Sequence, residues 1–355
     1  MQKKSLDTGS LFPALTARAT LNDVASQAGV DVSTASRVLR GDQKQRVGEE
    51  TRTRILDTAK KLNYRANITA RSLRAAKTFS IGIAVPQLDN PVFSQIIMGA
   101  ERGARERGYS LLIAHIGEGS SDDDAYERLA STNRVDGLLI TTLDDNSVVL
   151  HAAKKAGVPF VLLNRTGQGV DNSIYFDSNQ AAKIAVQHLI SLGHTRIAHL
   201  SGQLNPSTGI GRFAGYRDAL EEVNIPFDPS LVAVSGYTIK GGADAMRAVL
   251  QQAKELPSAV FPITLSAAVG AVMAIQQYGI RVPEDLSVVT VHDGPIAEAI
   301  FPPLTTVQMP VEKMGFDGAM GLIDLIEGRQ TKINCMMQPL QLVLRGSTSK
   351  APHRR

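Results

Sequence analysis

The sequence has few of the features that mark secreted, metal-binding or membrane proteins. It holds a single cysteine, Cys335, which excludes an internal disulfide framework and a cysteine-ligated zinc finger. No stretch approaches the roughly 18 uninterrupted apolar residues that a membrane helix requires. Residues 1–19 begin with a short basic cluster but lack the apolar core of a signal peptide. We therefore expect a cytoplasmic protein with a flexible leader at residues 1–19.

Catalytic and metal-binding patterns are also lacking. The seven histidines are scattered without metal-ligand spacing, and no Ser/His/Asp or Cys/His arrangement emerges. The segment GIGRFA at 209–214 matches the dinucleotide pattern G-x-G-x-x-A, but it does not follow its strand directly and no acidic residue is placed for a ribose. It is more simply a turn that opens a helix. We expect no catalytic residue, no metal and no cofactor, and an NAD-dependent dehydrogenase is the enzyme alternative.

Acidic residues are scarce in the first part of the chain. Residues 1–78 hold 15 Lys/Arg against 7 Asp/Glu, a net charge of +8, whereas the remainder holds 23 against 27, a net charge of −4. A basic excess confined to one end favours binding to nucleic-acid phosphates through the release of counterions. A solvated basic surface is the alternative interpretation of the charge alone.

The same basic region contains a helix–turn–helix pattern at residues 20–41, TLNDVASQAGVDVSTASRVLRG. Apolar residues recur at helical spacing on both sides of Gly29, and glycine can take positive φ and end a helix without steric cost. Two short helices joined by a glycine turn form the geometry that places the second helix in the major groove of DNA. A third helix is predicted over Glu49–Asn63. The polar residues of the second helix that can reach phosphates or bases are Ser33, Thr34, Ser36, Arg37 and Arg40.

From Phe79 onward, short apolar runs alternate with amphipathic segments. Strands are predicted at 79–85, 109–115, 135–141, 158–164, 196–202, 231–236, 258–263, 286–293 and 338–344, and helices near 92–107, 181–192, 211–223, 267–278 and 311–327. This alternation indicates parallel sheets covered by helices on both faces. The number of units predicts an α/β fold with two doubly wound lobes and a ligand site between them, at the carboxyl ends of the strands.

Several motifs, in this order and spacing, make the chain resemble the lactose-repressor/galactose-repressor (LacI/GalR) family of bacterial transcription regulators. They are TLNDVASQAGV…STASRVL, LNYRANITARSL, HLISLGHTRIAHLSG, GRFAGYRDAL, GIRVPEDLSVV and PPLTTV. The resemblance implies a three-helix helix–turn–helix domain at 20–65, a hinge helix and linker at 66–78, and a periplasmic-binding-protein-like domain for effector binding and dimerisation at 79–346. The lobes of that domain are expected at about 79–177 with 308–335 and at about 178–304 with 336–346, with residues 347–355 as a tail.

The resemblance also implies a homodimer on a pseudo-palindromic double-stranded operator. Family members read bases mainly through the two residues that open the second helix, here Val32 and Ser33, and Arg37 is the expected bidentate partner of a guanine. The segment 67–73 matches a hinge helix that folds on DNA, with Leu73 inserted into the minor groove. The implied DNA-contacting residues are Thr20, Val32, Ser33, Thr34, Ser36, Arg37, Arg40, Asn67, Ala70, Arg71 and Leu73.

The effector site departs from the pattern of sugar-binding relatives, which hold hydroxyls with an Arg, an Asn and an Asp. Arg212 matches the Arg, whereas Thr264 and His292 stand at the Asn and Asp positions, and Asn164 takes a position often held by Asp. This set is rich in donors, and arginine binds carboxylate or phosphate bidentately, so we predict an anionic effector such as a sugar acid or other organic acid. A neutral sugar and a site that has lost ligand binding are the alternatives. Further residues expected to line the site are Pro86, Phe176 and Tyr237.

Together these patterns predict a DNA-binding regulator, taken as a repressor, whose operator affinity is controlled by a small-molecule effector. Relatives respond either to inducers or to corepressors, and the sequence leaves that choice open. The C-terminal residues STSKAPHRR are too short and polar for the leucine heptad helix of tetrameric relatives, so we expect a dimer. A periplasmic solute-binding protein is the second alternative, but it requires an export signal and no DNA-binding head.

Overall fold

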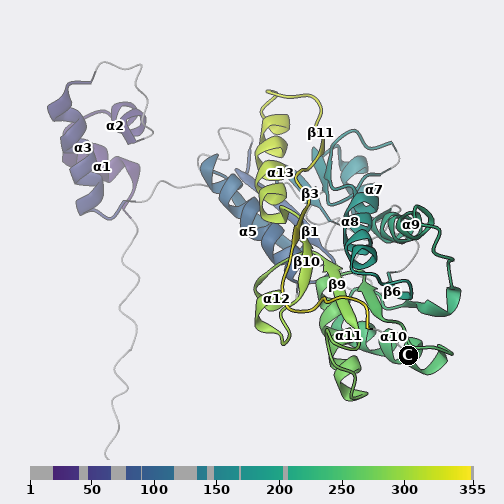
Figure 1. The fold of residues 1–355 in the computed structure, drawn as a ribbon. Helices are drawn as coiled ribbons and strands as arrows, with labels where there is room; N and C mark the ends of the chain where they lie inside the picture. Colours follow the sequence, from purple (N-terminus) through teal and green to yellow (C-terminus); the bar gives the residue numbers. More distant parts are fainter. Residues whose placement is uncertain are drawn as a thin grey trace, which may run out of the picture. The chain divides into compact units, whose positions relative to one another are not determined.

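The computed structural model describes residues 19–39, 47–64, 77–88, 90–115, 134–141, 148–167, 169–202 and 207–352. The chain divides into two compact units, Met1–Lys77 and Thr78–Arg355 (Figure 1). No helix among the described residues combines the length and the apolar character needed to span a membrane.

The first unit contains three helices, α1 (Leu21–Ala28), α2 (Val32–Leu39) and α3 (Glu49–Lys61). The hydroxyl of Thr20 accepts a hydrogen bond from the backbone N–H of Asp23, and the Asp23 carboxylate accepts one from the N–H of Thr20. This capping box satisfies free amides at the start of α1. Gly29 ends α1 in the left-handed conformation, with φ at 64°, as its position in the sequence predicts. One shared core contains Val24, Ala25, Ala28, Ala35, Val38, Ile55 and Ala59.

The first lobe of the second unit is a parallel six-stranded sheet in the order β11-β5-β4-β3-β1-β2. Its strands are β1 (Ser80–Val85), β2 (Ser110–His115), β3 (Gly137–Ile140), β4 (Phe160–Leu163), β5 (Ser173–Tyr175) and β11 (Asn334–Met336), and its helices are α5 (Pro91–Glu106), α7 (Val148–Ala156) and α13 (Val311–Ile326). Every residue of β3 is buried, as expected for a central strand of a sheet covered on both faces.

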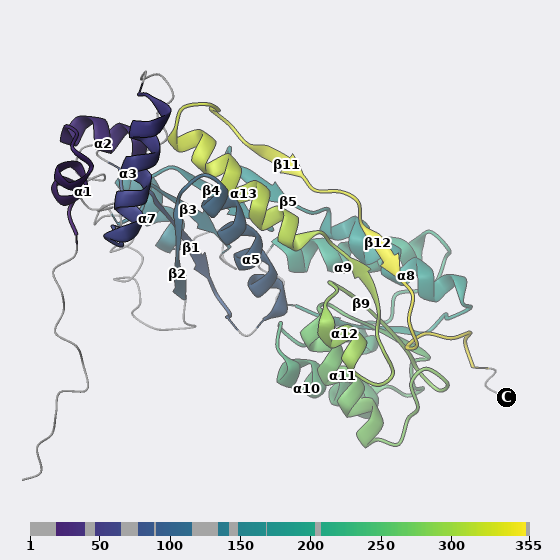
Figure 2. The ribbon, with the colours of Figure 1, turned by 90° about the vertical axis from the view of Figure 1, so that its left-hand side faces the viewer.

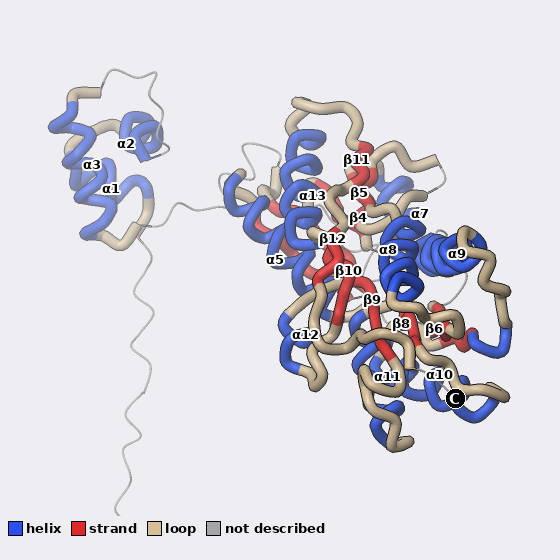
Figure 3. The backbone as a smooth tube through the Cα atoms, viewed as in Figure 1, coloured by secondary structure: helices blue, strands red, loops and turns tan. Residues whose placement is uncertain are grey.

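The second lobe is a six-stranded sheet in the order β12-β10-β9-β8-β6-β7, in which β12 runs antiparallel to β10. Its strands are β6 (Ile197–Ser201), β7 (Val232–Val234), β8 (Ala259–Pro262), β9 (Ser287–Val291), β10 (Thr305–Gln308) and β12 (Gln341–Val343), and its helices are α8 (Ser178–Ser191), α9 (Ser207–Glu221), α10 (Ile239–Gln252), α11 (Leu265–Gln277) and α12 (Pro295–Ala299). A short 3-10 helix spans Pro229–Leu231. Strands and helices alternate along both lobes (Figure 3), which confirms the doubly wound α/β fold.

The chain passes between the two sheets three times: from β5 to α8, from β10 to α13 and from β11 to β12. Figure 2 shows the last passage, where the yellow segment runs from β11 to β12. Met336 pairs with Tyr175 in the first sheet and Gln308 with Gln341 in the second. The sequence predicts residue 336 in the second lobe and residue 308 in the first. The observed pairings put Met336 in the first sheet and Gln308 in the second, so each boundary differs from the expected one by one residue.

Residues 347–352 do not form the tail expected from the sequence. Ser347 is fully buried, and its hydroxyl donates to the carbonyl of Val288 at 2.6 Å. The N–H of Ser349 donates to the hydroxyl of Ser287 at 3.0 Å, and the N–H of Ala351 donates to a backbone carbonyl of the loop after α8 at 2.9 Å. The small hydroxyl side chains satisfy their hydrogen bonds within the fold, so this polar segment is an integral part of the second lobe.

Candidate functional site

The outer face of α2 carries the residues expected to meet DNA. Ala35 and Val38 are buried in the core that the three helices share, and Leu39 packs against that core. Val32, Ser33 and Arg37 are exposed, and Thr34 and Ser36 are half-buried. One helix therefore presents an apolar residue, hydroxyls and a guanidinium on a face not occupied by the core of the first unit.

Thr20, another expected DNA contact, has a local role at the start of α1. It is exposed, and its hydroxyl donates to the carboxylate of Asp23 at 2.8 Å. Hydrogen bonds from the backbone and side chain of Thr20 hold the pKa of Asp23 below its usual value. The other predicted DNA contacts, Arg40, Asn67, Ala70, Arg71 and Leu73, lie outside the described residues.

Arg212 is the centre of the candidate ligand site in the second lobe. It projects from α9 and is only 1% exposed. Its Nη1 donates to the carbonyl of Ile263, directly after β8, at 2.8 Å, and its Nη2 donates to Nε2 of His292, directly after β9, at 2.7 Å. The guanidinium thus lies at the carboxyl ends of two parallel strands. Burial lowers the pKa of Arg212 to about 10, so the group remains positively charged at neutral pH.

His292 is a neutral partner of this cation. The side chain is 3% exposed, and burial together with the charge of Arg212 lowers the pKa of His292 well below its usual value. A neutral imidazole that accepts a hydrogen bond at Nε2 carries its proton on Nδ1. The contact therefore leaves the charge of Arg212 uncompensated and makes Nδ1 of His292 a donor.

Three buried polar atoms at this end of the sheet have no hydrogen-bond partner among the described residues: Nε of Arg212, Nδ1 of His292 and the hydroxyl of Tyr237. The Tyr237 hydroxyl lies against Gly202, where a Cβ would also meet the side chain of Ile263. Buried polar groups in proteins are nearly always paired. Because all three groups can donate hydrogen bonds, the cluster is suited to a ligand that supplies acceptors.

Asp293, the neighbour of His292, is engaged elsewhere. Nη1 and Nη2 of Arg345 donate to its two carboxylate oxygens at 2.8 and 3.0 Å, and both side chains are 12% exposed. Burial raises the pKa of Asp293, but the hydrogen bonds from Arg345 and Thr306 outweigh it and hold the pKa below its usual value. The backbone carbonyl of Asp293 accepts from Gln95 of α5 at 3.0 Å, a hydrogen bond between the two lobes.

Sequence reasoning missed Ile263, Gln95 and Arg345 as parts of this site. Ile263 contributes only its backbone carbonyl, which carries no sequence signal. Gln95 and Arg345 are 198 and 52 positions away from Asp293 along the chain. No local pattern connects residues so far apart.

The remaining predicted ligand residues fall into two groups. In the second lobe, the hydroxyl of Thr264 accepts from the N–H of Ala267 at 3.3 Å and caps α11. In the first lobe, Pro86, Asn164 and Phe176 directly follow β1, β4 and β5. Phe176 is 5% exposed and packs in the hydrophobic core, whereas Asn164 is half-buried with φ at 63°.

The glycine segment GIGRFA does not form the turn expected at the start of a helix, because it lies inside α9. A Cβ at Gly211 would come within 3.0 Å of Ser178, and one at Gly215 would overlap the carbonyl of Asn179. These glycines let α9 pack closely on α8. The described residues contain no group of three or more His, Cys, Asp or Glu side chains that could hold a metal ion.

Both units of the chain are similar to known proteins. The family description "Bacterial regulatory proteins, lacI family" matches residues 20–67, and "Periplasmic binding proteins and sugar binding domain of LacI family" matches residues 78–342. A curated relative, the HTH-type transcriptional repressor PurR of Aliivibrio salmonicida (strain LFI1238), is 31% identical over 340 residues, which cover 94% of this chain and 99% of the relative.

Two solved structures illustrate the same similarity. A Lac repressor dimer bound to operator and the anti-inducer ONPF has a TM-score of 0.80 and 30% identity, and the match covers 93% of this chain and 99% of that one. A complex of the transcriptional regulator CelR with cellobiose has a TM-score of 0.72 and 30% identity, and the match covers 93% of this chain and 100% of that one.

Proposed function

Because this chain belongs to the LacI family of bacterial regulatory proteins, we propose that it is a cytoplasmic homodimeric repressor that binds a pseudo-palindromic operator and is controlled by a small-molecule effector. The DNA-binding head and the ligand-binding domain of this family are both present. The similarity to the repressor PurR and to a Lac repressor dimer on its operator supports repression and dimerisation. Similarity to a family of transcription regulators favours this proposal over the dehydrogenase and the solute-binding alternatives.

The outer face of α2 supports the proposed reading of DNA. Val32, Ser33 and Arg37 are exposed on one short helix, and an arginine side chain can bond O6 and N7 of guanine simultaneously. We assign base contacts to Val32, Ser33 and Arg37 and further contacts to Thr20, Thr34 and Ser36. We also assign DNA contacts to Arg40 and to the hinge residues Asn67, Ala70, Arg71 and Leu73.

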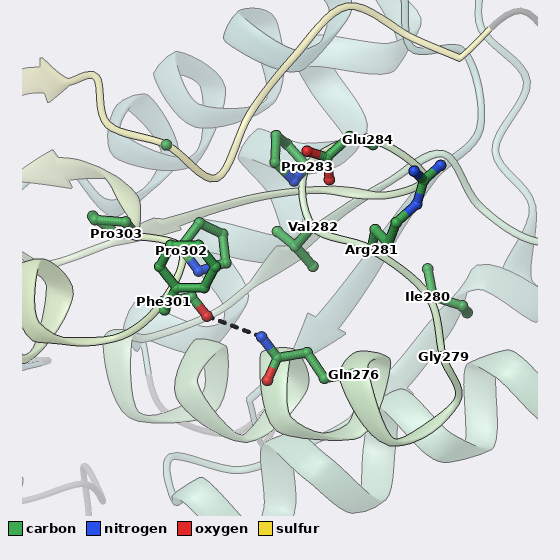
Figure 4. Close-up of a pocket in the computed structure, with 11 residues that line it drawn as sticks. Gln276, Gly279, Ile280, Arg281, Val282, Pro283, Glu284, Phe301, Pro302 and Pro303 are labelled. Atoms are coloured by element: carbon green, nitrogen blue, oxygen red, sulfur yellow. Dashed lines mark hydrogen bonds between the residues drawn. The ribbon is translucent and has the colours of Figure 1, made fainter.

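The proposed dimer has a candidate surface near the end of α11. Phe301 is 81% exposed, Met273 47% and Tyr278 46%, and Gln276, one turn after Met273, donates to the backbone carbonyl of Phe301 at 2.9 Å. Gln276 and Phe301 line a pocket of about 610 Å³ (Figure 4). Large apolar side chains gathered on one surface are typical of protein interfaces, so a second copy of this chain is the partner that we assign to it.

The effector class follows from Arg212. Its buried guanidinium has two neutral hydrogen-bond partners and no carboxylate within ion-pair distance among the described residues. A buried charge is normally paired because burial in an apolar environment is otherwise costly. This observation favours an organic anion, such as a sugar acid, as the effector. A neutral sugar is the second candidate, since the related CelR structure is a complex with cellobiose.

Effector binding would alter the arrangement of the two lobes and thereby the affinity for the operator, a coupling typically worth about 1–3 kcal/mol. The hydrogen bond from Gln95 to Asp293 links the lobes directly beside the site. A ligand bound at the site can therefore change the contact between the two lobes.

The proposed function is tested in two steps. Selection of bound duplexes from a random pool should enrich one inverted-repeat sequence, and transcription from a promoter that contains this repeat should fall when the protein is added. Gel-shift titrations with a panel of organic acids and neutral sugars should then identify a compound that changes operator affinity. Failure to enrich any sequence would contradict the operator-binding role, and an increase in transcription would contradict repression.

A further inference from the structure

The uncompensated charge of Arg212 depends on two neighbouring side chains. His292 occupies the position next to Nη2 of Arg212 and meets it with a neutral acceptor. Asp293, the carboxylate one residue further on, is bound by both terminal nitrogens of Arg345 and by Thr306. The structure thus places an imidazole at Arg212 and directs the adjacent carboxylate to another arginine.

The backbone conformation at residue 292 does not require a histidine. His292 has φ at 70°, a left-handed conformation in which His, Asn and Asp are all enriched among non-glycine residues. Its N–H donates to the carbonyl of Val307 at 3.0 Å, a bond available to any of these residues. An aspartate in the same backbone would bring a carboxylate to the guanidinium and neutralise it. The choice of side chain therefore sets the charge of the site.

We propose that His292 makes this site selective for a singly charged carboxylate, which accepts a hydrogen bond from Nε of Arg212, while Nδ1 of His292, on the far side of the imidazole ring, donates to a second acceptor of the ligand. The proposal rests on the anionic effector proposed above and narrows its class. A carboxylate carries one negative charge and supplies up to four acceptor positions. The hydroxyl of Tyr237, buried and unpartnered within the described residues, provides a third donor.

The net charge of the site favours a carboxylate over a phosphate as the ligand. The cluster formed by Arg212, His292, Ile263 and Tyr237 contains one cation, Arg212. A phosphate monoester carries about 1.5 to 2 negative charges at neutral pH. Its binding would leave negative charge unbalanced in a site from which water is largely excluded, and such charge is costly to bury.

The first experiment uses small probes that do not require knowledge of the effector skeleton. Histidine-selective 15N labelling of the full chain allows Nδ1 of His292 to be observed while sodium formate or acetate is titrated against sodium chloride at equal ionic strength. His292→Asn assigns the signal. A saturable shift that formate and acetate produce, and that chloride does not, supports the proposal. Absence of such a shift, in wild type and at any carboxylate concentration, overturns it.

The second experiment tests selectivity by thermal unfolding with D-gluconate, glucose and glucose 6-phosphate. His292→Asp should raise the Kd for gluconate, derived from the thermal protection, about thirtyfold or more, because the new carboxylate repels the ligand and occupies Arg212. His292→Asn keeps a donor and should retain part of the protection. His151→Asn, an exposed histidine on α7, is the matched control and should behave as wild type. If His292→Asp does not fold, Arg212→Gln tests the same contact.

The results distinguish this inference from the proposed function. If glucose 6-phosphate binds more tightly than the carboxylates, the effector is anionic but the carboxylate class is wrong. If only glucose protects, both the carboxylate and the anionic effector are wrong. If gluconate or formate binds equally well to wild type and His292→Asp, His292 is not the selective residue. Operator binding by each variant is measured in parallel, so that the repressor function is judged independently.

Discussion

Replacing Arg345 with methionine is expected to destabilise the ligand-binding domain substantially. Both terminal nitrogens of Arg345 bond the carboxylate of Asp293, and Nη1 also donates to Thr306 and to the carbonyl of Leu304. Arg345→Met leaves the 12% exposed Asp293 carboxylate without its cation. Removing one partner of a buried ion pair costs about 3–5 kcal/mol. Because Asp293 keeps its bond to Thr306, we expect about 3 kcal/mol, or a fall in Tm of roughly 6 °C.

The assay is urea or thermal unfolding of the full chain followed by circular dichroism, since the sequence contains no tryptophan for fluorescence. The matched control is Arg247→Met, which removes an arginine from an ion pair with Asp244 whose side chains are 37% and 49% exposed. Exposed ion pairs contribute about 0–1 kcal/mol. Equal destabilisation by the two variants would refute the reasoning, because burial of the Arg345–Asp293 pair is the basis of the predicted difference.

The same variant has a defined pH dependence. Hydrogen bonds from Arg345 and Thr306 hold the pKa of Asp293 below its ordinary value of 3.8 despite burial. A carboxylate with a lowered folded-state pKa contributes stability that is complete above the unfolded-state pKa and is lost as the pH falls through the folded-state pKa. The unfolded state is common to both proteins, so their stability difference depends on the folded-state pKa of Asp293 in each. Because loss of Arg345 leaves burial to raise that pKa, the difference should be complete near pH 7, begin to shrink as the pH falls through the raised pKa of the variant, and be smallest once the pH lies below the lowered pKa of wild type. A difference that grows on acidification would contradict this linkage.

Three further predictions concern DNA binding, assembly and the head. Arg37→Ala should weaken operator binding by about 1–3 kcal/mol and relax base preference at one position, whereas Arg37→Lys should keep the salt dependence but lose that preference in gel shifts; unchanged preference would contradict the guanine contact. Phe301→Asp should shift the dimer toward monomer in sedimentation equilibrium, since it places a charge in the proposed apolar interface, and an unchanged mass would move the interface elsewhere. Thr20→Ala should destabilise α1 by about 1 kcal/mol, seen as faster amide exchange, and Thr20→Ser should not.

Short and repetitive features of the fold were predictable. The helices of the head were predicted because apolar residues recur at helical spacing around Gly29, and most strands of the two sheets because parallel strands buried on both faces need continuous apolar runs. Other elements were not predicted: β5 and β11 have three residues each, and every residue of β11 is exposed. α7, α10 and α12 also lie where no helix was expected, and β10 lies where no strand was expected.

The sequence by itself determined that the chain contains a basic helix–turn–helix head and a two-lobed α/β domain, because periodicity and turn chemistry are local properties. It also predicted that Arg212 and His292 belong to one ligand site, in which His292 departs from the pattern of sugar-binding relatives. Only the tertiary structure decided that these two side chains meet, that Asp293 pairs with Arg345 and that Ser347 is buried. Those contacts join residues 80 and 52 positions apart, and their charge balance depends on which strand ends the fold brings together.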